Sequence, residues 1–493
     1  MTSPYNKAEL RQWLLRLCLC AAVCHLQCLS FSQSVLSLEQ AIRQAQDSAR
    51  VAFESRYEKE SNMLRYDEFM ALRKPQLNLR VAPNYYKVLS DLSRDYVYVR
   101  NYNNLSAAAS VTLSQKMLNW GGEAYVSTSA IWTEYLGSNK TYSRQFVATP
   151  LVVGYRQTLL GYNPYRWEKA LEDQRLKAAL QQHEYDMNAI AEETAKRYFR
   201  LVCAQGDLIM SMYRKRVADT LYAIALEKSS IAMVTLAELR SLSLDCENVA
   251  NEVEIARTTE EVARNELASY LMMDKNTLIN SDYSLLSLHS YVDNLRAKPV
   301  SLTADEAIVM AMENSPVLQH KTAQVIESRQ QEQKARKERG LNVALDLNVG
   351  MQQVNRNLGE AYRDQRSYAL ASVTLSVPLI DHGAARKRHS AAKAWVEREE
   401  SALEEAERKL REDVVSTLQE VRTSYLILGR THDAITKADE VFNMIADNYA
   451  NGLCDINTYA LAEHRRSDAY QHYLRTLEKY WTSYYHLKTL LGI

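Results

Sequence analysis

The chain contains an internal duplication. The stretch LSLEQAI, which starts at Leu36, is repeated within VSLTADEAI, so that Ala41 and Ile42 match Ala307 and Ile308 about 266 positions later. Such a duplication predicts that both halves form the same succession of elements. Because the 493 residues include only 13 Gly and 8 Pro, those elements should be long and mainly helical. We therefore divide the chain into a leader at 1–32 and two repeats at 33–299 and 300–493.

The first 32 residues have the pattern of an export signal. The basic residues Lys7, Arg11 and Arg16 surround the apolar stretch WLLRLCLCAAVC, and the small or polar residues LSFSQS follow it. This order predicts export with cleavage near Ser32. A buried helix is the alternative, because Arg16 interrupts the apolar stretch. The cysteines here do not follow the small-residue pattern of a lipoprotein cleavage site, so lipid anchoring is not favoured.

Both repeats contain stretches in which apolar and polar side chains alternate, as they do in strands. The pentapeptide SVTLS occurs at 110–114 and again at 372–376. In the second repeat the strands are expected between about 341 and 379, and in the first near 77–86, 105–115, 122–133 and 151–160. The offset between the repeats falls from 262 to about 220 positions across this region. The added length of about 40 residues suits one extra hairpin in the first repeat.

Helical periodicity accounts for the rest of each repeat. An amphipathic helix is predicted before the strands, at about 38–74 and 302–339, and a long helix after them, at about 163–228 and 383–451. At 1.5 Å per residue each long helix would be roughly 100 Å long. Each then turns back into a helix of about 40 residues. The strands would therefore gather at one end of a helical column.

The strands are the candidate membrane segment. Beyond residue 33 no run of 18 or more apolar residues occurs, so a spanning segment would have to be a closed β-barrel. Single-chain barrels begin at about eight strands, so several copies would share one. Eleven of the 31 tyrosines lie between residues 85 and 165, and such residues gather at bilayer interfaces. The alternating pattern predicts these lipid-facing residues: Val343, Leu345, Leu347, Val373 and Leu375.

Three kinds of segment stand out: the duplicated LSLEQAI and TADEAI, the strand-to-helix passages YRQTLLGYNPYRWEKALE and SVPLIDHGAARKR, and the returning turn NYANGLCDINTYALAEHRRSDAYQHYL. In these segments the chain resembles the TolC family of outer-membrane efflux proteins, and the resemblance covers nearly the whole chain after the leader. It implies a mainly α protein that forms a homotrimer with a shared β-barrel in outer-membrane lipid and a helical tunnel through the periplasm. In similar proteins each chain contributes four strands to the shared barrel. The extra hairpin leaves two alternatives, an 18-strand rim or a hairpin folded over the mouth of a 12-strand barrel.

The resemblance also implies a function and partners. The chain would be the channel component of a tripartite efflux or type I secretion system and would form a passive duct from the periplasm to the outside. Its partners would be a periplasmic adaptor of the membrane fusion type and an inner-membrane transporter of the RND or ABC type. The substrate cannot be read, because a wide tunnel needs no specific pocket.

In similar proteins, polar residues at the helical turns hold the tunnel closed. Tyr449 and Thr235 match two of them. Other matching positions lack the charged residue: Cys454 replaces an Arg, and Thr458, Leu461 and Leu236 replace Asp. We therefore expect closure to depend on packing of Tyr449, with Asp447 and Asp455 as the nearest charged substitutes. The adaptor would touch the turns at these residues: Ser230, Ile231, Gly452 and Leu453.

Enzymatic chemistry is not indicated. The sequence has no GxxxxGK[ST], GxSxG or HExxH motif, so neither catalysis nor a cofactor or metal is predicted. Sixty acidic and sixty basic residues cancel, which argues against nucleic acid as a partner. The remaining alternative is a structural or adaptor-like periplasmic coiled-coil protein, which would not need lipid-facing strands.

Overall fold

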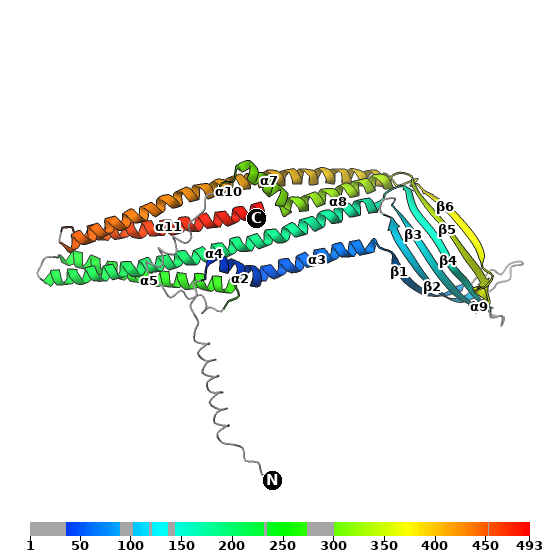
Figure 1. Ribbon diagram of the computed structural model, residues 1–493, viewed down its shortest axis with the longest axis horizontal. Coiled ribbons are helices and arrows are strands. Elements are labelled where there is room, and N and C mark those ends of the chain that lie inside the picture. The colour runs from blue at the N-terminus through cyan, green and yellow to red at the C-terminus, as the bar shows by residue number, and fades with distance from the viewer. Residues whose placement is uncertain are drawn as a thin grey trace, which may run out of the picture.

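The computed structural model describes residues 36–88, 102–117, 121–136, 143–230, 234–273, 300–451 and 453–493. The leader at 1–32 lies outside these residues. Long helices run along one axis and a single sheet lies at one end (Figure 1). The elements follow in this order: α2 (Leu38–Ser48), α3 (Arg50–Leu72), β1 (Gln76–Val88), β2 (Tyr102–Met117), β3 (Gly122–Leu136), β4 (Ser143–Leu160), α4 (Pro164–Ser230), α5 (Leu236–Tyr270), α7 (Ala304–Asn314), α8 (Pro316–Glu338), β5 (Asn342–Asn355), α9 (Leu358–Ala361), β6 (Arg366–Ser376), α10 (Ala384–Ala450) and α11 (Ile456–Leu491).

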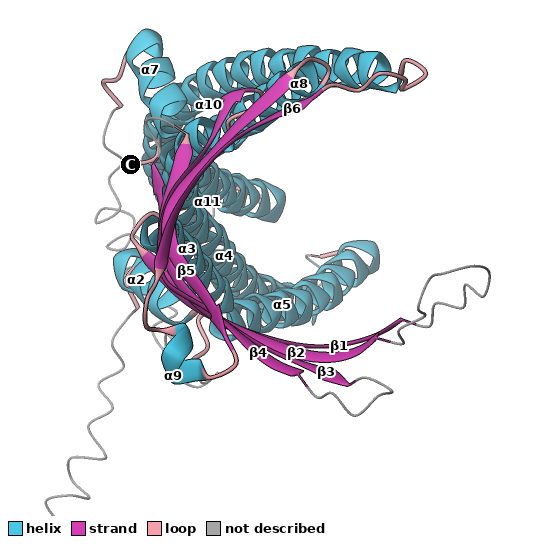
Figure 2. Cartoon of the chain, turned by 90° about the vertical axis from the view of Figure 1, so that its right-hand side faces the viewer, coloured by secondary structure: helices cyan, strands magenta, loops and turns pink. Residues whose placement is uncertain are grey.

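The sheet has six strands in the order β1-β2-β3-β4-β5-β6, and every neighbouring pair is antiparallel. Viewed along the helices, it curves as an open arc (Figure 2). The first repeat contributes four of these strands, including the additional hairpin β2–β3, and the second contributes two. The two repeats therefore form one continuous sheet.

The two long helices, α4 and α10, each have 67 residues and are about 100 Å long. Each leaves the sheet and then turns back, α4 into α5 and α10 into α11. Helices α4 and α11 also pack against each other, which joins the two repeats. Gly206 on α4 permits this approach, because a Cβ at that position would lie 2.2 Å from Leu474 Cδ1. The core here is aromatic, with the Phe199 and Trp481 rings stacked at 6.1 Å.

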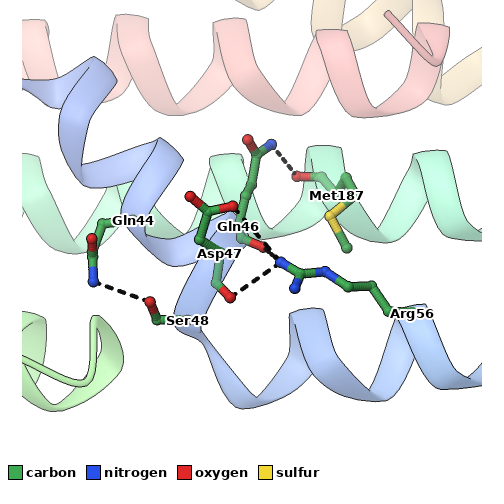
Figure 3. Close-up of polar contacts among 6 residues, drawn as sticks. All are labelled: Gln44, Gln46, Asp47, Ser48, Arg56 and Met187. Atoms are coloured by element: carbon green, nitrogen blue, oxygen red, sulfur yellow. Dashed lines mark hydrogen bonds and ion pairs between the residues drawn. The ribbon is translucent and has the colours of Figure 1, made fainter.

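The sequence-based prediction of one continuous helix before the strands is wrong in both repeats. Helix α2 ends and α3 begins on either side of Ala49, whose ψ of 142° is extended. The Arg56 guanidinium on α3 binds the carbonyl oxygens of Gln46 and Asp47 at the end of α2 (Figure 3). The Gln46 side chain donates a hydrogen bond of 3.1 Å to the Met187 carbonyl on α4. Arg56 thus satisfies carbonyl groups that the end of α2 leaves free, and Gln46 ties this end to α4.

The second repeat has the equivalent break between α7 and α8. Ser315 is extended and its hydroxyl accepts a hydrogen bond from the Leu318 backbone N–H, while Pro316 occupies the first position of α8. A residue before proline is disfavoured in helical geometry, which explains the break at this position. The periodicity of apolar residues continues across both breaks and therefore did not reveal them.

Among the described residues, the helices include none that is long and apolar enough to cross a membrane.

Candidate functional site: a two-faced sheet and two helical turns

The five sequence-predicted lipid-facing residues lie on one face of the sheet. In the antiparallel pairing of β5 with β6, Val343 lies opposite Leu375 and Leu345 lies opposite Val373. Leu347 follows two residues later, opposite Ala371. Directly paired residues point to the same side of a sheet, and alternate residues of a strand share a side. The structure therefore brings all five together on one face.

This apolar face continues across all six strands. Directly paired residues extend it from strand to strand. Leu347 on β5 lies opposite Tyr155 on β4, Val153 on β4 lies opposite Val126 on β3, and Leu113 on β2 lies opposite Leu77 on β1. Its members on the other strands are Leu77, Leu79, Val81 and Tyr85 on β1; Leu105, Ala107, Ala109, Val111 and Leu113 on β2; Ala124, Val126, Ala130 and Trp132 on β3; and Phe146, Ala148, Leu151, Val153 and Tyr155 on β4. Leu77 and Leu79 are 70% and 71% exposed in one chain. A patch of this extent needs an apolar environment.

The apolar face has the dimensions of a bilayer core. On β4 it runs from Phe146 to Tyr155, about ten residues, which is the length a tilted strand needs to cross the hydrocarbon. Aromatic residues lie near both limits, with Trp132 and Phe146 paired at one end and Tyr155 at the helix end. Outer-membrane strands carry such aromatic girdles at both interfaces.

The opposite face is mostly polar. Its members include Asn78 and Arg80 on β1, Ser110, Thr112 and Ser114 on β2, Glu123 and Ser127 on β3, Arg156 and Thr158 on β4, Asp346 and Asn348 on β5, and Ser372 and Thr374 on β6. Arg156 Nε lies 3.1 Å from Asp346 Oδ2, and the Tyr125 hydroxyl donates to Asp346 Oδ1 at 3.4 Å. One row, Ile131, Val147 and Val354, is apolar. A face with this composition is suited to water.

Two devices curve the sheet. Register shifts occur at Ser127/Ser129, at Ala148/Leu151 and at Thr158/Leu160. Tyrosine rings also lie over glycines on the neighbouring strand. A Cβ at Gly154 would lie 2.2 Å from Tyr125 Cζ, and one at Gly350 would lie 3.0 Å from Tyr368 Cε1. Bulges and ring-covered glycines are the features that bend a sheet toward closure.

The sheet does not close within one chain. Strands β1 and β6 end its order, and neither has a partner on its outer edge among the described residues. Their N–H and C=O groups are available for pairing with another chain.

At the far end of the helices, Tyr449 packs within its own chain. Its ring lies 5.2 Å from that of Tyr459 on α11, which lies 5.5 Å from Phe442 on α10. Phe442 in turn lies 6.2 Å from Tyr213 on α4. We call Tyr449, Tyr459, Phe442 and Tyr213 the aromatic ladder. Burial raises the pKa of the Tyr449 phenol, so it remains neutral.

Asp455 and Thr235 cap helices. The Asp455 carboxylate accepts a hydrogen bond of 3.0 Å from the Thr458 backbone N–H at the start of α11, and hydrogen bonds from Thr458 lower its pKa. Thr235 forms a capping box with Glu238 at the start of α5. Thr458, considered from the sequence only as the replacement for an Asp, is thus the partner of Asp455. The signal for the caps was local, a Thr or Asp three residues before its partner.

The three other sequence-predicted turn residues that the structure describes, Ser230, Asp447 and Leu453, are exposed. Asp447 lies on the exposed surface of α10, and Leu453 is 75% exposed. The Ser230 hydroxyl donates a hydrogen bond of 2.6 Å to the Glu227 carbonyl. Ile231 and Gly452 lie outside the described residues.

A buried ionic network lies close to the aromatic ladder, and periodicity gave no signal for it. Glu463 on α11 is 5% exposed, and its carboxylate lies 3.7 Å from Arg214 on α4, which also contacts Glu252 on α5 at 2.9 Å. Arg466 contacts Asp439 on α10 at 2.6 Å and lies over the Phe442 ring at 4.7 Å. Burial raises the pKa of Glu463 to about 7, although Arg214 and Arg466 oppose this. The network connects α4, α5, α10 and α11.

Comparisons with known proteins agree with this geometry. Residues 307–493 match the model of the family described as "Outer membrane efflux protein". The resemblance to outer-membrane efflux proteins of the TolC type is confirmed. No curated protein matches the sequence.

Solved structures with a similar fold include outer-membrane proteins. The outer membrane protein VceC of Vibrio cholerae is 11% identical, with a TM-score of 0.64 over 92% of this chain and 96% of that one. The Campylobacter jejuni CmeC outer membrane channel is 13% identical, with a TM-score of 0.63 over 92% and 85% of the two chains. The open-state Neisseria gonorrhoeae MtrE outer membrane channel is 14% identical, with a TM-score of 0.61 over 93% and 89%. At these identities the likeness establishes the fold.

Proposed function

We propose that the protein is the outer-membrane channel component of an efflux or type I secretion system. Three copies would share a β-barrel and form a passive duct from the periplasm to the outside. The observation that carries this proposal is the sheet, whose apolar face is about one bilayer thick and whose opposite face is polar. The family match of residues 307–493 and the channel structures of the same fold support it.

Assembly from several copies would bury surface that one chain leaves exposed. Helices α3 and α10 lie at the two borders of the helical arc and carry exposed apolar side chains. Tyr57 on α3 is 67% exposed, and Trp395 on α10 is 55% exposed. In a ring of copies, α3 of one chain would pack against α10 of the next, as β1 would pair with β6. The lipid-facing assignment of Val343, Leu345, Leu347, Val373 and Leu375 is part of this proposal.

The periplasmic gate would lie at the helical turns. Tyr449 would close the duct by packing, since its ring belongs to the aromatic ladder. Asp455 and Thr235 would contribute by fixing the starts of α11 and α5. Asp447 would remain a solvated acid. The periplasmic adaptor, itself joined to an RND or ABC transporter, would contact the turns at Ser230, Ile231, Gly452 and Leu453.

Single-channel recording tests the proposal. Purified full-length protein should insert into planar bilayers and give discrete conductance steps without any energy source, because a passive duct needs none. A protein that remains water-soluble and produces no steps would instead match a structural coiled-coil protein.

A further inference from the structure

The hairpin β2–β3 occupies the interior of the sheet. Strand β2 pairs with β1 along the whole of β1, from Gln76–Ser114 to Val88–Tyr102, and β3 pairs with β4. At the helix end, β2 and β3 are joined to each other and not to a helix, whereas β1, β4, β5 and β6 connect to α3, α4, α8 and α10. A hairpin folded over a mouth would leave β1 beside β4. In the structure β2 and β3 lie between them.

Both faces of the hairpin continue those of its neighbours. Val111 on β2 lies opposite Leu79 on β1, and Val126 on β3 lies opposite Val153 on β4, all on the apolar face. On the other face Thr112 lies opposite Asn78. A segment that stays in water would not need an apolar face in register with the lipid-facing residues.

The hairpin also matches the width of the sheet to that of the helices. Helices α3, α4, α8 and α10 pack side by side in that order. At about 10 Å per helix, four helices occupy about 40 Å of a wall. With a strand spacing of about 4.8 Å and a tilt of about 40°, six strands occupy about 38 Å, whereas four would occupy only about 25 Å.

We propose that the β2–β3 hairpin is part of the membrane wall, so that three chains form an 18-stranded barrel about as wide inside as the helical tunnel. This inference rests on the proposed channel function. The edges permit closure, because strand directions alternate and β6 of one chain would meet β1 of the next antiparallel. A duct of nearly constant width would let through the barrel any solute that is small enough to pass through the helical tunnel.

Arginine substitution tests whether the hairpin contacts lipid. Val111→Arg should reduce the yield of outer-membrane trimers roughly ten-fold or more, because a charge near the bilayer midplane is strongly disfavoured. Thr112→Arg, one residue away on the water face, should leave the yield within about two-fold of the wild-type value. Val349→Arg on β5, which lies opposite Val153 on the apolar face, serves as the reference for a wall position outside the hairpin.

The outcomes separate the two proposals. If Val349→Arg lowers the yield and Val111→Arg does not, the hairpin lies outside the wall and this inference is wrong. If neither lowers it, the sheet does not span a membrane and the proposed function fails as well.

A distance measurement tests the strand number on a folded protein. A spin label would be attached at Thr374→Cys on the polar face and, in a second variant, at Leu375→Cys on the apolar face, with the native cysteines replaced. Because the two labels lie on opposite sides of the strand backbone, the mean of their separations reports the position of the backbone itself. In a three-fold barrel the label separation averaged over both sites should be about 30 Å for 18 strands and about 20 Å for 12. A mean near 20 Å in pulsed electron paramagnetic resonance would overturn the wide barrel.

Discussion

Individual side chains near the turns have roles that sequence reasoning assigned only in part. The sequence predicts Asp455, with Asp447, as the nearest charged substitute for the missing gate residues, yet in the structure its carboxylate accepts hydrogen bonds from Thr458. The pairing is local and could have been read from the spacing of an N-cap. Glu463 could not, because its burial against Arg214 depends on how α11 packs on α4. Contacts between residues close in sequence can therefore be predicted from the sequence, whereas contacts between distant segments cannot.

The gate prediction follows from these roles. Tyr449→Ala should raise resting single-channel conductance more than Asp455→Ala, because it removes one end of the aromatic ladder. The normalised conductance should change little with salt, since screening weakens ion pairs and not packing. Asp455→Asn should behave like the wild type, because Asn caps helices about as well as Asp. If Asp455→Asn opened the channel as much as Asp455→Ala, the carboxylate charge itself would be the latch.

Glu463 should make stability depend on pH. Its pKa in the folded protein is raised by burial to about 7, so the folded state retains a proton that the unfolded state releases above about pH 4.5. Stability should therefore fall as pH rises from about 5 to 8, by about 1–3 kcal/mol from this group. Glu463→Gln should reduce the difference between thermal midpoints measured at the two pH values. An unchanged difference would mean that Glu463 is ionised throughout.

At the scale of elements, alternation located the strands well because a half-exposed strand has a strict period of two. The strands near 105–115 and 122–133 correspond to β2 and β3, which extend to Met117 and Leu136. Alternation could not show where the hairpin would lie, since that depends on pairing between distant segments. The helix breaks at Ala49 and Ser315 were missed because each is a single extended residue inside a continuing apolar pattern, although Pro316 is a local signal for the second break.

A pair of adjacent substitutions on β6 tests the two faces. Leu375→Arg, near the helix end of the apolar face, should cost up to about 1 kcal/mol and lower the recovery, and Thr374→Arg should be tolerated in the water-filled lumen. The readout is the amount of heat-resistant assembly recovered from outer membranes. Thr374 is a better control than Asp346, whose replacement would also remove the contact with Arg156. Equal recovery of the two variants would contradict the assignment of faces.

For the whole molecule, the sequence indicated that one sheet could not close alone, and the free edges of β1 and β6 agree with that expectation. Mass measurement in mild detergent should give three copies. Disulfides should form between Ser372→Cys on β6 and one of Asn78→Cys or Arg80→Cys on β1, and should link chains into a covalent trimer. Leu79→Cys, on the opposite face, should not link. A stable folded monomer would contradict the shared barrel.

The position of the β2–β3 hairpin has a consequence for how such sheets can diverge. Because β2 and β3 connect to each other and not to any helix, the hairpin could be gained or lost without changing a single connection between strand and helix. A hairpin always adds two strands, so the alternation of directions that lets neighbouring chains pair is preserved. In an assembly of three copies, pore width could thus evolve in steps of six strands while the helical tunnel kept its number of helices. Strand count and tunnel architecture would then be inherited independently.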